Sequence, residues 1–116
     1  MLLRRIAPVL AILLLAPVPA ANAAMVDSEA CRRDVVAVDT AYADSMRALE
    51  SVAEGRREVC PAWRAHREVA KRASAVYARC YLGTDRRVGT ARMNAVMADF
   101  DDAIAHLAPR YANYRK

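Results

Sequence analysis

The sequence predicts an all-α fold, a small antiparallel three-helix (up-down-up) bundle stapled by one disulfide. Two observations lead to the bundle: apolar residues recur at spacings of three and four in three successive stretches, and the stretches are separated by short connections. A separate observation, the placement of the cysteines, predicts the disulfide. We expect a helical domain over residues 24–108, preceded by a leader at 1–23 and followed by a short tail at 109–116.

The central helix is expected between Pro61 and Gly83. Proline suits the first turn of a helix, where its missing N–H costs nothing, and glycine suits the position just past the end. One side of this stretch is an apolar stripe that includes His66 and Cys80. We define the basic face as the five cationic residues on the other side; it is a possible binding face, although such a charge run is more often solvated surface. The basic face consists of Arg64, Arg67, Lys71, Arg72 and Arg79.

The first helix is expected from Met25 to Gly55, with Asp27 or Ser28 as its N-cap. Either side chain can accept a hydrogen bond from the first turn, and glycine is a good stop. A near-heptad seam supports antiparallel packing on the central helix. The seam consists of Cys31, Val35, Val38, Tyr42, Ser45, Leu49 and Val52.

The third helix has two possible starts, at Thr84-Asp85 or after a cap at Thr90, and it is expected to end before Pro109. Beyond it, Tyr111 and Tyr114 either dock on the bundle or lie in a frayed tail. An acidic cluster near the end of this helix is expected to be exposed and could pair with the basic face. The apolar seam consists of Met93, Met97, Phe100, Ile104 and Leu107, and the acidic cluster of Asp99, Asp101 and Asp102.

Residues 1–23 resemble a secretory signal peptide. Arg4 and Arg5 precede an apolar stretch, and Ala21-Asn22-Ala23 forms a small-x-small cleavage site, so we expect a cut between Ala23 and Ala24. The apolar stretch is short for a transmembrane span, which needs about 20 apolar residues. After the cut, 16 basic and 13 acidic side chains leave a net charge of +3, with the two signs mixed along the chain. These features predict a protein of the bacterial periplasm or a secreted protein, without a nucleic-acid partner.

Geometry indicates which cysteines pair. Cys60 and Cys80 are 20 residues apart on one expected helix, which separates them by roughly 30 Å, whereas a disulfide needs Cα atoms within about 7 Å. Cys31 begins the first helix and Cys80 ends the second, so antiparallel helices place both at the same end. The sequence therefore predicts a Cys31–Cys80 disulfide in an oxidising compartment.

Cys60 is left at the other end, near the start of the central helix, with Arg56, Arg57 and Arg64 close in sequence. Three readings remain open: a buried thiol that only packs, an intermolecular disulfide in a homodimer, or a reactive thiol. The last reading would make the protein a thiol-dependent redox or stress-response protein. There is no Cys-x-x-Cys motif in the sequence.

No catalytic constellation is supported by the spacing of the polar residues, so we expect a protein that is not an enzyme and needs no cofactor. The leading expectation is an exported module that acts by contact with an unknown protein or envelope partner. A weaker alternative is copper or zinc binding through scattered histidines and methionines, although methionines at helical spacing more often fill a core. The candidate ligands are His66, His106, Met46, Met93 and Met97.

Overall fold

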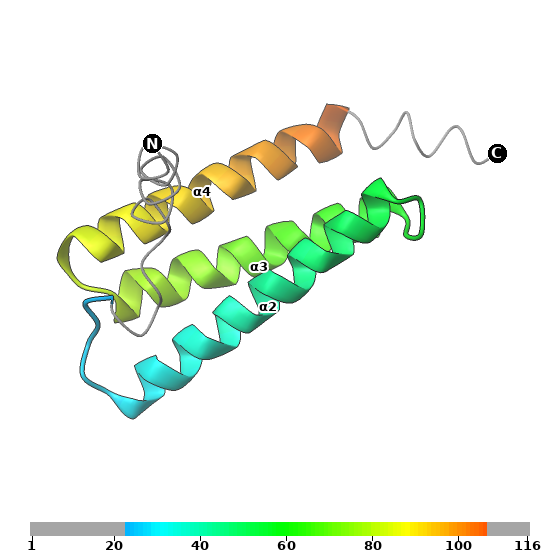
Figure 1. Ribbon diagram of the computed structural model, residues 1–116. Coiled ribbons are helices and arrows are strands. Elements are labelled where there is room, and N and C mark those ends of the chain that lie inside the picture. Colours follow the sequence, from blue (N-terminus) through cyan, green and yellow to red (C-terminus); the bar gives the residue numbers. More distant parts are fainter. Residues whose placement is uncertain (1–22, 107–116) are drawn as a thin grey trace, which may run out of the picture.

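The structure, a computed structural model, describes residues 23–106. Residues 1–22 of the expected leader (1–23) and the tail with Tyr111 and Tyr114 lie outside the described residues. The described chain forms three helices, α2 (Glu29–Ala53), α3 (Val59–Cys80) and α4 (Gly83–His106), in an up-down-up arrangement. This confirms the predicted antiparallel bundle. Helix α3 lies between the other two and packs against both, while α2 and α4 make little direct contact (Figure 1).

The helix ends follow from local chemistry. The Ser28 side chain caps α2, because its Oγ accepts a hydrogen bond from the Cys31 N–H at 3.0 Å. The expected helix therefore started four residues too early, at Met25. Gly55 and Gly83 both have positive φ, which suits a residue without a Cβ. However, Gly83 does not directly follow α3, because Tyr81 and Leu82 lie between them. Gly83 is instead the first residue of α4, so Thr90 lies inside this helix and does not cap it.

The core lies mainly between α2 and α3. Small side chains on α3, including Ala70 and Ala73, are fully buried and let the helices approach closely. Valines from both helices fill the space between the backbones, and Met93 is the buried residue contributed by α4. The main cluster consists of Cys31, Val35, Val38, Ala70, Ala73, Val76, Cys80, Tyr81 and Met93.

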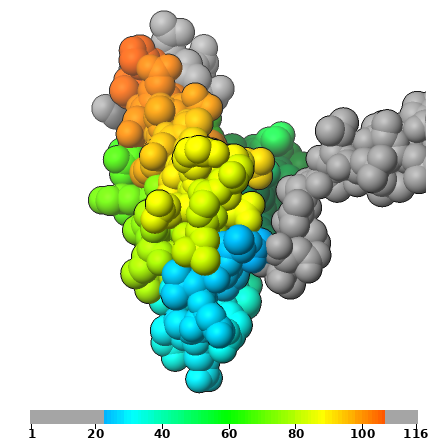
Figure 2. All heavy atoms as spheres, turned by 90° about the vertical axis from the view of Figure 1, so that its left-hand side faces the viewer, coloured from blue at the N-terminus to red at the C-terminus, as the bar shows by residue number. Residues whose placement is uncertain are grey.

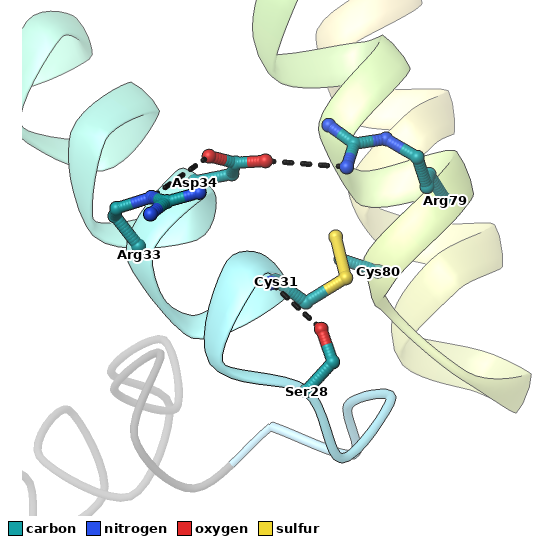
Figure 3. The surroundings of a disulfide bond; sticks show 6 residues. All are labelled: Ser28, Cys31, Arg33, Asp34, Arg79 and Cys80. Atoms are coloured by element: carbon teal, nitrogen blue, oxygen red, sulfur yellow. Dashed lines mark hydrogen bonds and ion pairs between the residues drawn. A yellow bond between two sulfur atoms is a disulfide. The ribbon is translucent and has the colours of Figure 1, made fainter.

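The Cys31–Cys80 disulfide joins the start of α2 to the end of α3, with Cα atoms 5.3 Å apart (Figure 3). Both cysteines are buried in the core cluster. Above the disulfide, Asp34 of α2 pairs with Arg79 of α3 at 3.2 Å. The predicted disulfide is thus present, and the end of the bundle that holds it is also tied by a salt bridge.

A short extended segment precedes α2 and was not expected from the sequence. Met25 forms an isolated antiparallel bridge with Tyr81. The Val26 N–H donates to the Cys80 carbonyl at 2.8 Å, and the Leu82 N–H donates to the Ala24 carbonyl at 2.9 Å. Figure 2 faces this end of the molecule and shows the segment lying against the starts of α2 and α4. The segment therefore joins the chain before α2 to the connection between α3 and α4.

Candidate functional site

A pocket of about 390 Å³ opens where the extended segment meets the three helices. We call it the tyrosine pocket and define it by its aromatic and charged residues. Each helix supplies part of the wall, so the pocket exists only when the bundle is assembled. The defining residues are Asp39 and Tyr42 from α2, Tyr77 from α3, Tyr81 after α3, and Asp85 and Arg92 from α4.

Two tyrosines form one wall of the tyrosine pocket. The rings of Tyr77 and Tyr81 stack almost parallel, with centroids 4.6 Å apart. The Tyr77 hydroxyl donates a hydrogen bond to the Asp39 carboxylate, which crosses from α3 to α2. Burial and the neighbouring Asp39 raise the pKa of Tyr77, and burial also raises the pKa of Tyr81. Tyrosine phenols are already neutral near pH 7, and these shifts keep both hydroxyls protonated at higher pH as well.

Gly89 of α4 faces this stacked pair. A Cβ at this position would lie 3.3 Å from Cδ2 of Tyr77 and 3.3 Å from Cδ2 of Tyr81. The absence of a side chain lets α4 approach the rings closely, which completes the pocket wall. The other charged groups, Asp85 and Arg92, come from the same helix. The pocket therefore combines an aromatic wall with two carboxylates and one guanidinium group.

The Gly89→Ala variant tests this close approach. In an ordinary helix interior the change stabilises a protein by about 1 kcal/mol. Here the added methyl crowds a fixed ring pair, and overpacking costs roughly 1–3 kcal/mol. We expect the free energy of unfolding, measured in urea, to fall by up to about 2 kcal/mol. A gain of about 1 kcal/mol instead would show that the rings move aside freely.

A second polar contact lies at the centre of the bundle. His66 of α3 is 1% exposed, and its Nδ1 lies 2.8 Å from the Ser45 Oγ of α2. The Ser45 hydroxyl donates its single proton to the Tyr42 carbonyl at 2.9 Å, so we assign the Nδ1–H of His66 as the donor to Ser45. The imidazole also contacts the rings of Tyr42 and Phe100, with centroids at 4.9 and 4.7 Å. All three helices therefore meet at this histidine, and burial lowers its pKa.

The basic face is divided by the fold. Arg67 pairs with Asp101 of α4 and Glu68, and Arg79 pairs with Asp34 of α2. These two arginines therefore link helices. The other members of the basic face, Arg64, Lys71 and Arg72, are exposed.

The remaining candidates are spread over the bundle. Cys60 is the second residue of α3, partly buried, and outside the disulfide. Its assignment as a packing, intermolecular or reactive thiol stays a prediction. His106 is exposed and contacts Asp102 one turn earlier, whereas Met93 is buried and Met46 is exposed. Within residues 23–106, the structure holds no group of three or more His, Cys, Asp or Glu side chains placed to ligate a metal ion.

The sequence pattern placed Tyr42 on the apolar seam of the first helix and assigned none of the tyrosines of the pocket to a site. Asp39 and Arg92 were not singled out, and Asp85 was considered only as part of a possible helix start. The available signals were the i,i+4 spacing of Tyr77 and Tyr81, and Gly89 within an otherwise helical stretch.

None of the helices in the described part of the chain is long and apolar enough to cross a membrane. No protein-family model, curated protein or solved structure matches the chain.

Proposed function

We propose that this chain is an exported helical protein of the bacterial periplasm or envelope that acts by binding rather than by catalysis. Export is supported by the leader expected at residues 1–23, whose composition is that of a cleavable signal peptide. It is also supported by the Cys31–Cys80 disulfide, which is buried in the core at the junction of two helices. Such cross-links persist in oxidising compartments and are rare in the bacterial cytosol.

The tyrosine pocket is the observation that carries the binding proposal. Ligand sites in proteins are concave, have mostly apolar or aromatic walls, and hold a few convergent polar groups. The pocket has these properties: stacked rings form one wall, and Asp39, Asp85 and Arg92 approach it from two helices. The phenol of Tyr77 is held in place by Asp39, so part of the wall is already arranged before a ligand enters.

The test is native mass spectrometry of the protein purified without denaturation from the bacterial periplasm. We expect a fraction of the wild-type protein to carry an additional small-molecule mass. Arg92→Ala should reduce that fraction at least severalfold, because Arg92 is an exposed member of the pocket. The matched control is Arg87→Ala, an exposed arginine of α4 outside the pocket, which should retain the mass.

The same experiment separates the pocket from the basic face. A variant with alanine at Arg64, Lys71 and Arg72 removes three exposed members of the basic face that lie outside the pocket. If this variant loses the bound mass while Arg92→Ala keeps it, the basic face is the binding surface and the pocket is not. If the protein stays in the cytosol with residues 1–23 attached, the export proposal is wrong.

A further inference from the structure

The main-chain nitrogen of Ala24 lies 2.8 Å from Oδ2 of Asp85, in the first turn of α4. The position of this nitrogen is fixed by its neighbours. The Ala24 carbonyl accepts from the Leu82 N–H, and two residues later the Val26 N–H donates to the Cys80 carbonyl. Figure 2 shows this segment seated on the starts of α2 and α4. Ala24 is therefore held in place by residues on both sides of the α3–α4 connection.

The expected cleavage site lies directly before this nitrogen. Hydrolysis of the Ala23–Ala24 peptide bond breaks one C–N bond; water supplies the hydroxyl of the new Ala23 carboxyl group and a hydrogen of the new Ala24 amino group. An α-amino group has an ordinary pKa of about 7.7–8.0, so it is mostly protonated at pH 7. The neutral N–H that now donates to Asp85 would become an ammonium group beside a carboxylate. The existing hydrogen bond already has a carboxylate as its acceptor, and cleavage would add the attraction between two opposite charges.

We propose that cleavage between Ala23 and Ala24 exposes an α-ammonium group on Ala24, and that Asp85 binds this group. The resulting ion pair adds a contact at the end of the bundle that holds the disulfide. This inference rests on the export proposed above. Asp85 contacts the Ala24 nitrogen, and the other titratable or charged groups of the adjoining tyrosine pocket are Arg92 of α4, Asp39 and Tyr42 of α2, Tyr77 and Tyr81.

The cut has a second consequence for the tyrosine pocket. Ala23 lines this pocket together with Tyr77, Tyr81 and Asp85. Hydrolysis removes Ala23 and everything before it, so the processed chain loses one residue that lines the pocket and gains a cation beside Asp85. The precursor and the processed protein therefore present different pockets.

The experiment compares three chains that all end at Lys116. The first begins at Ala24 with a free amino group, the second begins at Ala24 with an acetyl group, and the third begins at Ala23. Each is prepared from a fusion protein by a protease that leaves the native first residue, with and without Asp85→Asn. Acetylation keeps an N–H donor and removes the charge, whereas the extra residue moves the charge away from Asp85.

Two readouts follow the proposed ion pair. By NMR, the α-amino pKa of the chain beginning at Ala24 should exceed the ordinary value of about 7.7–8.0 by half a unit or more, and Asp85→Asn should abolish the rise. In urea, acetylation should lower the folding equilibrium constant about two- to fivefold, as expected for an exposed ion pair. That loss should disappear in the Asp85→Asn background. Asp99→Asn, an exposed acidic position of the same helix, is the control and should change neither readout.

Two results would overturn the inference. One is an α-amino pKa that Asp85→Asn leaves unchanged, and the other is identical behaviour of the chains beginning at Ala23 and Ala24. Because these chains are made without export, both results are independent of the proposed function. The mass of protein recovered from the periplasm tests the link to processing separately, since a first residue other than Ala24 would overturn that link.

Discussion

Replacing Cys31 and Cys80 together by alanine should lower the free energy of unfolding by roughly 4 kcal/mol. The disulfide closes a sequence separation of 49 residues, and its removal gives the unfolded chain back the freedom of that loop. Small domains are stabilised by only about 5–15 kcal/mol, so the variant should unfold at a much lower urea concentration. The core also loses two buried sulfur atoms from the cluster that includes Val35 and Val76.

The matched control is Cys60→Ala, which removes a cysteine and leaves the disulfide in place. A reducing agent should destabilise the wild-type protein and Cys60→Ala by similar amounts and leave the Cys31→Ala/Cys80→Ala variant unaffected. Equal urea midpoints for the wild-type protein and the double variant would contradict the prediction, because the cross-link would then add nothing to stability.

The second large effect is expected at the buried contact between Ser45 and His66. Ser45→Ala removes the acceptor of the imidazole Nδ1–H and leaves a buried donor unsatisfied, which costs about 1–3 kcal/mol. Urea unfolding measures the loss. Ser51→Ala is the control, because Ser51 lies further along α2 and its hydroxyl donates to the Arg47 carbonyl of its own helix. Its effect should stay within about 0.5 kcal/mol.

His66 should also make the fold sensitive to acid. Burial lowers the pKa of His66 below its ordinary value of 6.5, so below this pH the unfolded chain binds a proton more readily than the folded chain. Stability should therefore fall as the pH drops from 7 toward 5.5, by at most about 1.4 kcal/mol per pH unit for one proton. His66→Asn keeps a donor toward Ser45 and should flatten this slope, whereas His106→Gln, at the exposed histidine, should keep it. A wild-type slope that survives His66→Asn would mean that another group is responsible.

The disulfide could be predicted because the rise of a helix and the antiparallel arrangement decide which cysteines meet. The periodicity similarly predicted three helices, and Ser28 was one of two caps considered. The start of α4 could not be decided in advance, since Thr84 and Thr90 offered equivalent local chemistry. The residues before Gly83 decide it in the structure. Tyr81 and Leu82 form a short extended link that pairs with residues 24–26, and α4 begins directly after this link, at Gly83.

The site depends on information that periodicity does not contain. Asp39, Tyr77 and Asp85 come from separate elements, and their meeting depends on how α2 and α4 are placed around α3. The same arrangement of α2 and α4 around α3 brings Asp101 to Arg67 and Asp34 to Arg79. Two members of the basic face therefore link neighbouring helices. A helical repeat identifies the exposed side of a helix, but it does not identify the neighbour that lies beside it.

The two ends of this bundle are held in different ways. At one end, a covalent link, a β-bridge and a salt bridge join α2, α3 and the chain before them. At the other end, α2 and α3 meet through the turn at Gly55, and the last described turns of α4 hold Ile104 only partly buried. The disulfide end is therefore cross-linked more heavily than the end that holds Gly55. Thermal opening should start at the Gly55 end, where Cys60 lies, and the disulfide end should remain closed until the whole domain unfolds.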